Sequence, residues 1–382
     1  MRRRVAERRF TGRLFLPMNP IGSPADVPLH MRAPWQPVDP AGSTWSEILS
    51  ADPLVIHAVP STGFPLGSVG VIGPLVRDRN AHFLLMLPWT IEPPHDSRAW
   101  IDAATDYLAN HQRHRLTFLT NTERERQIID AAEIEAVMIN QNCLANDAVY
   151  HPIPNIEPVF DAVYNARLSP QKRPDLATEI ERLALVYYYG SFEYTVPQFH
   201  AEHARLRAMT PRATFVNKLT PQGCEWLPSN RVNKVLAQSR VGLCLSAAEG
   251  AMWASIEYLF AGLSVVSTPS LGGRDHYFDK EYCIIAQPDP RTIREAVDAL
   301  VARAVPREVV RAKTLARVET DRARYVAFVQ ELIDRGGSSV QFADRFRSLI
   351  HGRGISVWRS MVEFSSTVAA ALDEVRATLT ST

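Results

Sequence analysis

The sequence predicts an α/β protein with two Rossmann-like domains followed by C-terminal helices. Three observations lead to this prediction. Short apolar runs alternate with amphipathic helical stretches along most of the 382 residues, a pattern typical of βαβ units around a parallel sheet. The chain is also longer than one ordinary domain of about 100–200 residues. Finally, a proline-spaced stretch, HPIPNIEPVF at residues 151–160, interrupts the alternation as an extended crossing between domains would.

The first domain is expected to span residues 1–155. Strands are predicted at residues 13–16, 54–58, 83–87 and 116–119. Helices are predicted between them, at residues 45–49, 66–76, 100–110 and 122–132. The last helix has Asn121 or Thr122 as its N-cap and the acidic Glu123 in its first turn. Residues 17–44 are rich in proline and glycine with little periodicity, so we expect a long loop over a cleft mouth.

The second domain is expected to span residues 156–325, with helices over residues 326–382 beyond it. Its strands are predicted at residues 162–166, 184–188, 213–216, 241–245, 264–267 and 282–285. Its helices are predicted at residues 174–182, 196–209, 230–237, 251–260, 290–303 and 306–316. The tail is expected to be mostly helical, with turns at Gly336–Gly337 and at residues 352–354.

Composition and charge narrow the class of protein. Lys and Arg number 42 against 41 Asp and Glu, a formal charge of +1, which removes the global electrostatic argument for nucleic acid. The four cysteines form no CxxC motif and are expected to be reduced in a cytoplasmic protein. Five arginines stand near the N-terminus: Arg2, Arg3, Arg4, Arg8 and Arg9. They could contact anionic lipid at the inner face of the membrane, although a solvated tail is the default.

Two carboxylates stand in one of the most apolar parts of the chain. Residues 249–273 read EGAMWASIEYLFAGLSVVSTPSLGG, with Glu249 and Glu257 eight positions apart. Glu249 follows the predicted strand 241–245, and therefore lies at the sheet edge where α/β folds bind ligands. The backbone N–H groups of Gly250 and Ala251, at a helix N-terminus, suit a phosphate. Glu249 is then expected to face sugar hydroxyls and Glu257 ribose hydroxyls. The alternative is a pair of surface glutamates.

This stretch resembles the E-x7-E signature of retaining GT-B glycosyltransferases, in the large family 4-like group that contains sucrose synthase and the mannosyltransferases. The shared positions keep the spacing of the signature: Glu249, Gly250, Glu257, Gly262, Val265, Val266, Gly272 and Gly273. The chain departs from the signature at Ala251 and Met252, where the family usually has Phe-Gly.

A second match lies about eighty residues earlier. In YNARLSPQKRPDL, Arg167 and Lys172 resemble the GRLxxxKG element of the same family, with Ala166 and Arg173 in place of its glycines. A guanidinium and an ammonium at the end of a strand can hold a diphosphate together and stabilise its charge as it leaves. By itself such a pair would more often be solvated.

The first domain matches the family less well. Residues 54–59, LVIHAV, resemble a family strand. The family places a histidine that contacts the donor sugar at the end of the following strand, but Trp89 or Thr90 stands there. His95 could take this place through a longer loop, or it could be a surface histidine flanked by prolines. Gly22 could allow close approach of the donor phosphates, or it could be a turn glycine.

The resemblance implies two facing Rossmann-like domains with a deep cleft, and C-terminal helices that fold back on the first domain. It implies metal-independent transfer of a sugar from a nucleotide sugar, with UDP- or GDP-sugars as the expected donors, to a hydroxyl of a glycan, lipid or small molecule. The anomeric configuration would be retained and no cofactor needed. Arg167 and Lys172 would stabilise the leaving diphosphate, while Glu249 would orient the donor sugar. A sugar-nucleotide epimerase and an inactive nucleotide-sugar-binding protein remain alternatives.

Other motifs are weaker. His200 and His203 lie on one helical face, where a surface pair is expected rather than a zinc site. The sequence contains neither the GxGxxG nor the GxxxxGK[ST] motif. It also lacks a GxSxG motif, which argues against an α/β-hydrolase. The longest apolar span, residues 241–266, contains two carboxylates, so a buried strand and helix are expected there instead of a membrane span.

Overall fold

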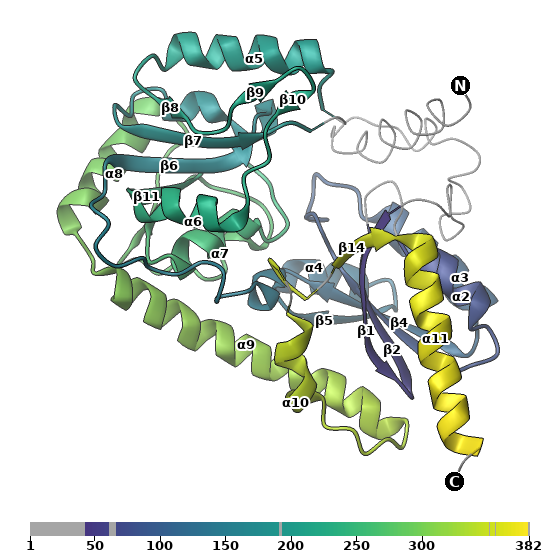
Figure 1. The fold of residues 1–382 in the computed structure, drawn as a ribbon. Helices are drawn as coiled ribbons and strands as arrows, with labels where there is room; N and C mark the ends of the chain where they lie inside the picture. The colour runs from purple at the N-terminus through teal and green to yellow at the C-terminus, as the bar shows by residue number, and fades with distance from the viewer. Residues whose placement is uncertain (1–42, 61–65, 191–192, 351, 356, 381–382) are drawn as a thin grey trace. The chain divides into compact units, whose positions relative to one another are not determined.

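The protein is described by a computed structural model that covers residues 43–60, 66–190, 193–350, 352–355 and 357–380. The chain forms two compact units (Figure 1). The first takes the chain up to Leu144 and again from Thr320, and the second comprises Ala145–Glu319. Several predicted features lie outside the described residues: strand 13–16, loop residues 17–42, Gly22 and the five N-terminal arginines.

Within the described residues, the first unit contains a six-stranded sheet in the order β14-β1-β2-β3-β4-β5. Its strands are β1 (Ser43–Ala51), β2 (Leu54–Val59), β3 (Ala81–Met86), β4 (His114–Thr120), β5 (Glu135–Met138) and β14 (Val357–Ser360). Strands β2 to β5 are parallel, whereas β1 pairs antiparallel with β2 and β14. The three predicted strands that become β2, β3 and β4 are confirmed, because each is a nearly continuous buried run.

The helix expected at residues 45–49 is wrong, because these residues belong to β1. Apolar side chains at positions 45, 48 and 49 have helical spacing. Burial alternates at the start of the strand instead, since Thr44 and Ser46 are buried while Trp45 is exposed. The outer partner of β1 comes from the far end of the chain, with Trp45 opposite Trp358. A local pattern carries no information about such a partner.

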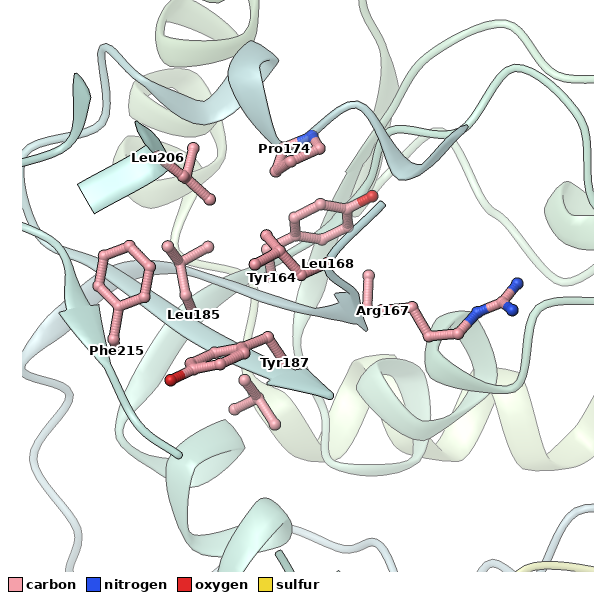
Figure 2. A pocket seen from close by; sticks show the side chains of 10 residues that line it. Tyr164, Arg167, Leu168, Pro174, Leu185, Tyr187, Leu206 and Phe215 are labelled. Atoms are coloured by element: carbon pink, nitrogen blue, oxygen red, sulfur yellow. The ribbon is translucent and has the colours of Figure 1, made fainter. Parts of the chain in front are cut away.

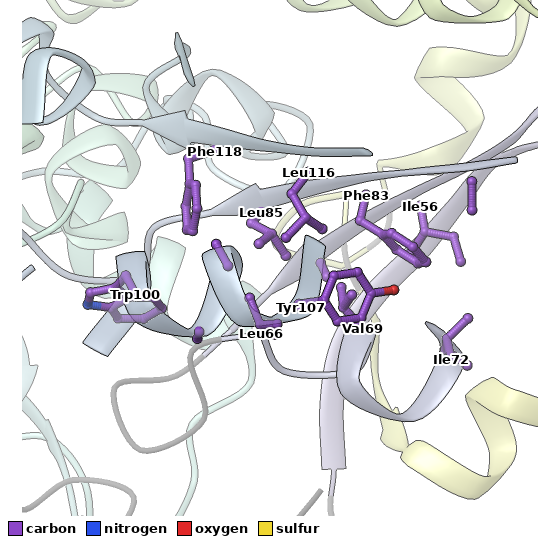
Figure 3. Close-up of a cluster of buried hydrophobic side chains, with 14 of the residues drawn as sticks. Ile56, Leu66, Val69, Ile72, Phe83, Leu85, Trp100, Tyr107, Leu116 and Phe118 are labelled. Atoms are coloured by element: carbon purple, nitrogen blue, oxygen red, sulfur yellow. The ribbon is translucent and has the colours of Figure 1, made fainter. Parts of the chain in front are cut away.

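Helices cover the first sheet. They are α2 (Val69–Leu75), α3 (Arg98–Asn110), α4 (Glu123–Asp130), the short 3₁₀ turn η4 (Gln141–Leu144) and α11 (Met361–Thr380), which contacts β1 and α2. Figure 3 shows the core, where Phe83 and Leu116 of the sheet pack with Trp100 and Tyr107 of α3. The C-terminal helix α11 adds Phe364, Val368 and Leu372 to this core.

The N-cap of α4 is Thr122, one of the two predicted residues. Its hydroxyl accepts the N–H of Glu125 at 3.1 Å, while the Glu125 carboxylate accepts the N–H of Thr122 at 3.3 Å. This reciprocal capping box satisfies two of the backbone donors that a helix start leaves unpaired.

The second unit contains a sheet whose six described strands are all paired in parallel. They are β6 (Phe160–Arg167), β7 (Leu183–Tyr188), β8 (Thr214–Phe215), β11 (Ser239–Cys244), β12 (Ser264–Ser267) and β13 (Cys283–Ile285). All six are predicted from the sequence. Their order, β13-β12-β11-β6-β7-β8, runs outward from β6 on one side and from β11 on the other. The direction of winding therefore reverses between β6 and β11, which is the topological switch point of a Rossmann-like sheet.

The helices of the second unit are α5 (Val196–Met209), α6 (Ser229–Ala237), α7 (Trp253–Phe260) and α8 (Pro290–Arg303), and a small hairpin pairs β9 (Leu219–Thr220) with β10 (Gly223–Cys224). α5 and α8 have their predicted limits, because Thr195 and Asp289 cap them. The helix expected at residues 174–182 is wrong. Only a 3₁₀ turn, η6 (Pro174–Ala177), forms there, after Arg173 takes a left-handed φ of 49°.

The C-terminal part is helical, with α9 (Arg307–Arg335), α10 (Phe342–Phe346), the 3₁₀ turn η8 (Arg347–Leu349) and α11. α9 extends far beyond the predicted residue 316, and the boundary between the units falls inside it. The predicted turn at Gly336–Gly337 is confirmed. The apolar span 241–266 forms β11, α7 and β12, as expected. In the described part of the chain, no helix has both the length and the apolar character needed to cross a bilayer.

Candidate functional site

The predicted residues of the second domain lie around the switch point. Arg167 is the last residue of β6, and Lys172 ends the 3₁₀ turn η5 (Pro170–Lys172) that follows it. Glu249 lies in the loop after β11, and Glu257 lies in α7. Strands β6 and β11 are neighbours in the sheet, so the loops that follow them meet at the edge where open α/β sheets bind ligands.

Lys172 is folded back over the sheet by its tight turn. Pro170 occupies the first position of the turn, and the Lys172 N–H donates to the Ser169 carbonyl at 3.1 Å. The hydroxyl of Tyr164, a residue of β6, donates to the Lys172 carbonyl. The ammonium of Lys172 then forms a hydrogen-bonded ion pair with Oε1 of Glu249. With 7% and 4% of their surfaces exposed, both residues are nearly buried.

The loop after β11 holds the backbone of Glu249 in place. The Glu249 N–H donates to the Leu271 carbonyl at 3.1 Å, and the Gly273 N–H donates to the Gly250 carbonyl at 2.7 Å. The Ser246 hydroxyl also donates to Oε1 of Glu249. Burial raises the pKa of Glu249, but the Lys172 ammonium, the Ser246 hydroxyl and a nearby guanidinium outweigh it, so that the pKa lies below its usual value. Glu249 is therefore an anion at neutral pH.

That guanidinium belongs to Arg274, a residue that the sequence motifs did not single out. Arg274 is only 1% exposed. It donates to the Ser246 carbonyl and the Ser267 hydroxyl, each at 2.6 Å, and to Asp275 at 2.8 Å. Arg274 thus ties the ends of β11 and β12 together beneath Glu249. The available signal was its position, directly after the two glycines of the E-x7-E-like stretch.

Arg167 faces a second carboxylate. Figure 2 shows its side chain extending from the end of β6 away from the apolar side chains around Tyr164 and Leu185. Its Nη1 lies 3.6 Å from Oε1 of Glu193, and the two side chains are 15% and 14% exposed. Glu193 precedes α5 in a loop without a recognisable motif, which is why it was missed from the sequence.

Glu257 joins α7 to the sheet. It is 1% exposed, and its Oε2 accepts from the Asn165 amide at 3.3 Å. The neighbouring Tyr258 hydroxyl accepts the backbone N–H of Asn165 at 2.7 Å. Gly242 in β11 leaves room for this ring, since a Cβ there would lie 2.4 Å from Tyr258. The alternative of two surface glutamates is therefore wrong for both Glu249 and Glu257.

The start of α7 differs from the prediction. The helix begins at Trp253, two residues later than expected, so Gly250 and Ala251 lie in the preceding loop. Met252, its N-cap residue, has φ of 52° and ψ of 90°. Such a backbone favours glycine, the residue that the resembled family carries at this position. The chain thus keeps a glycine-like backbone conformation without the glycine.

His95 lies in the first unit, in the loop after β3. Its ring meets the ring of Trp89 edge-on, with 6.3 Å between the centroids. Burial lowers its pKa, while Glu92 acts in the opposite direction. His95 is therefore a half-buried histidine that is neutral at pH 7. It belongs to a different unit from Arg167 and Lys172.

The expected surface pair of histidines is also wrong. His203 is 5% exposed and packs between Tyr187 and Phe215, with ring centroids 5.2 and 4.7 Å away. His200 lies 3.0 Å from the Thr220 carbonyl. Over the part of the chain that the structure describes, no group of three or more His, Cys, Asp or Glu side chains could hold a metal ion.

One exposed aromatic residue stands near the charged cluster. Trp226 is 68% exposed, and its ring meets Tyr188 edge-on at 5.6 Å. Tyr188 ends β7, where it is in register with Arg167 of β6. An exposed aromatic ring is thus in contact with the end of the strand next to β6.

Solved structures that resemble the protein include HepE and a sucrose-phosphate synthase. HepE from Anabaena in complex with UDP has a TM-score of 0.50 at 15% identity, over 69% of this chain and 76% of that chain. Sucrose-phosphate synthase from Thermosynechococcus elongatus has a TM-score of 0.54 at 16% identity, over 74% of each chain. No protein-family model matches the sequence. No curated protein matches it either.

These similarities establish the fold. The two Rossmann-like units and the C-terminal helices have the GT-B architecture, as the sequence predicted. The site at the switch point is a cluster of two cations and two carboxylates in the second unit.

Proposed function

We propose that the protein is a glycosyltransferase that moves a sugar from a nucleotide-sugar donor to a hydroxyl acceptor. The observation that carries this proposal is the Lys172–Glu249 pair beside Arg167 at the switch point of a GT-B fold. The crystal structure of HepE, a structural neighbour, contains UDP, which supports a nucleotide as the ligand. UDP- and GDP-sugars are the proposed donors.

Arg167 and Lys172 would hold the donor diphosphate. A guanidinium can grip phosphate oxygens with two parallel hydrogen bonds, whereas an ammonium acts as a point charge. Their largely buried position strengthens this attraction, because nearby water screens it less. Together they would stabilise the charge that develops on the leaving diphosphate, a role for which many enzymes use a divalent cation. We therefore propose transfer without a metal.

Glu249 would orient the donor sugar. Its Oε1 is held by Lys172 and Ser246, which fixes the carboxylate as an acceptor for sugar hydroxyls. Glu257 is the proposed partner of the ribose hydroxyls, and His95 is the proposed sugar contact from the first unit. Glu257 is almost completely buried beside Asn165. A Glu257→Gln variant therefore tests the proposed ribose contact with little change in side-chain volume.

The proposed reaction retains the anomeric configuration. The acceptor oxygen forms a bond to the anomeric carbon on the face from which the diphosphate departs, and the bond between that carbon and the phosphate oxygen breaks. The acceptor proton passes to the leaving phosphate oxygen. No protein nucleophile is needed, so Glu249 remains a positioning carboxylate in this scheme.

A thermal-shift screen against UDP-, GDP-, ADP- and dTDP-sugars tests the donor. A ligand at about a hundred times its dissociation constant adds about 2.7 kcal/mol of stability. Turnover of the selected donor with hydroxyl acceptors, in the presence of EDTA, then tests transfer without a metal, and NMR of the product shows whether the anomeric configuration is retained. Loss of transfer in EDTA would remove the metal-independent part of the proposal, and an inverted product would remove retention.

The absence of the family histidine at Trp89 and Thr90 favours one rival, a nucleotide-sugar-binding protein without catalysis. Binding without transfer to any of a broad acceptor panel would support that rival. Conversion of the donor alone into an epimer would support the other alternative, a sugar-nucleotide epimerase.

A further inference from the structure

The charged cluster of the second unit is balanced before any ligand binds. Arg167 faces Glu193 at 3.6 Å, and Lys172 pairs with Glu249. The exposed fractions of these four side chains are 15%, 14%, 9% and 5%, in the same order. Two positive and two negative charges therefore share a largely buried site. A diphosphate that binds Arg167 and Lys172 adds negative charge to a cluster that is already neutral.

The other charged side chains nearby are engaged elsewhere. Arg274 pairs with Asp275. The guanidinium of Arg173 donates to the Leu245 carbonyl and, at 2.7 Å, to the Thr268 hydroxyl. Even when Arg173 is counted, a bound diphosphate with two negative charges leaves an excess of negative charge in the site.

Glu193 and Glu249 differ in how they could respond. Glu249 is held by Lys172, Ser246 and Arg274, and these groups keep its pKa low. Both carboxylate oxygens of Glu193 are buried, and Oε1 lies 3.6 Å from the Arg167 guanidinium, beyond ordinary hydrogen-bond distance. Burial raises the pKa of Glu193, although Arg167 and, more weakly, Ser169 and Lys172 oppose this effect. Of the two carboxylates, Glu193 is the one that accepts a proton more easily.

The surroundings of Glu193 come from several elements. The groups that face it are Arg167 at the end of β6, Ser169 and Lys172 of the following turn, and Glu249 of the loop after β11. Its neighbour Tyr194 is faced in turn by Glu202, Arg205 and Asp175. A ligand that engages Arg167 and Lys172 therefore removes most of the positive charge that stabilises ionised Glu193, while Glu249 continues to repel it.

We propose that binding of a nucleoside diphosphate sugar is coupled to uptake of one proton by Glu193. This inference rests on the proposed function, because it requires a diphosphate at Arg167 and Lys172. In its neutral form Glu193 no longer repels the ligand, and its hydroxyl becomes a hydrogen-bond donor. Glu193 thereby makes donor affinity dependent on pH in a range where the nucleotide sugar itself does not titrate.

Calorimetry with UDP-glucose tests the coupling, with GDP-glucose as the second probe. Titrations at pH 7 in two buffers with different ionisation enthalpies give the number of protons taken up. We expect net proton uptake by the wild-type protein, and a dissociation constant that rises by up to about tenfold per pH unit between the pKa of Glu193 in the free protein and its higher pKa in the complex. The wild-type pH profile needs no variant, so a folding defect cannot obscure it.

A Glu193→Gln variant locates the proton. Its proton uptake should vanish and its affinity should become independent of pH. Glu181→Gln is the matched control, since the Glu181 side chain is 71% exposed, and it should behave like the wild type. Proton uptake that persists in Glu193→Gln would overturn the assignment to Glu193. Binding without proton uptake in the wild type would overturn the coupling alone, whereas failure of both nucleotide sugars to bind would overturn the donor site of the proposed function.

Discussion

The two units close the carboxyl ends of their parallel strands in different ways. In the first unit, the amide side chains of Asn121 and Asn140 form hydrogen bonds with backbone groups. The Asn121 amide donates to the Leu87 carbonyl at 2.8 Å, and the Asn140 amide donates to the Asn121 carbonyl at 3.1 Å. The Gln141 N–H donates to the Asn121 side-chain oxygen at 2.9 Å. The buried carboxylate of Glu125 takes part as well, since it accepts the Asn121 N–H at 2.7 Å.

In the second unit, the corresponding edge carries Arg167, Lys172, Glu193 and Glu249. Ionised groups are far more costly to bury than amides, so their presence at a sheet edge needs either internal partners or a ligand. Here the partners are carboxylates that a diphosphate could replace. A Rossmann-like sheet therefore occurs in both units, and in the described part of the chain the second unit carries these paired cations and carboxylates. This contrast is our reason for proposing the donor site in the second unit.

The largest expected effect comes from the Lys172–Glu249 pair. Lys172→Met and Glu249→Gln should each reduce transfer by about a hundredfold or more, or about 3 kcal/mol of transition-state stabilisation. Each single change leaves an uncompensated buried group, so stability should fall too. The double variant should regain part of the stability but none of the activity. Thermal unfolding and initial rates separate the two effects, and near-normal turnover in either single variant would contradict the role of the pair.

Arg167→Ala should weaken binding of the donor by about tenfold or more, because a guanidinium contributes about 1.5–3 kcal/mol through charged hydrogen bonds. Arg167→Lys should recover only part of this affinity, since an ammonium lacks the planar fork. Calorimetry with the selected nucleotide sugar measures both. The matched change in the first unit, Arg98→Ala at an exposed site, should leave binding unchanged, and equal effects at Arg98 and Arg167 would break the contrast between the units.

Trp226→Ala should weaken binding by about fivefold or more, whereas Trp226→Phe should retain most of the affinity. A nucleobase stacked on an aromatic ring gains about 1–3 kcal/mol. Trp226 is exposed and contacts Tyr188, whose backbone is in register with Arg167. The affinity of a diphosphate without a base, such as inorganic pyrophosphate, should not change. If the Ala variant binds the nucleotide sugar as tightly as the wild type, Trp226 does not contact the base.

The last prediction concerns the stability of the first unit at acid pH, an effect outside the candidate site. Burial lowers the pKa of His57 to about 3 and that of His82 to about 4, because it disfavours the charged imidazolium form. At acid pH the folded state binds fewer protons at each histidine than the unfolded state. The contribution of each neutral histidine to the free energy of unfolding is therefore complete above pH 6.5 and is lost as the pH falls. Burial raises the pKa of Glu125 to about 7, despite its hydrogen bonds. Its contribution has the opposite sign and grows as the pH falls below 7.

Between pH 7 and pH 5, each histidine therefore removes about 2 kcal/mol, and Glu125 restores about 2 kcal/mol. A Glu125→Gln variant should lose about twice as much stability over this interval as the wild type. Urea denaturation at pH 7 and pH 5, monitored by hydrogen exchange of the β2 to β4 amides, measures the difference in the free energy of unfolding. An identical pH dependence in both proteins would show that the Glu125 carboxyl is ionised in the folded state.

The strands of the second unit could be predicted because each is a short apolar run bounded by turn residues. The N-terminal caps of α5 and α8 made their limits predictable as well. β1 could not be recognised, since the spacing of Trp45 and Ile48 resembles a helix and the partner strand β14 is remote in sequence. Burial and register depend on such distant contacts, which a single sequence does not show.

The candidate site was predictable only in part. Arg167, Lys172, Glu249 and Glu257 were found through a motif resemblance, and the structure places them around one switch point. The direct pairing of Lys172 with Glu249 joins residues 77 positions apart, and nothing in the local sequence predicts it. Glu193 escaped detection for the same reason, because only the folded chain brings it to Arg167.

Hydrogen exchange with and without the selected nucleotide sugar tests the placement of the donor most directly. We expect saturating ligand to slow exchange in residues 164–173 and 246–252 of the second unit, and to leave the ends of β3 and β4 in the first unit nearly unchanged. Lys172→Met should abolish this protection at the same ligand concentration. Protection confined to the first unit, or unchanged protection in Lys172→Met, would contradict the placement of the diphosphate at the switch point.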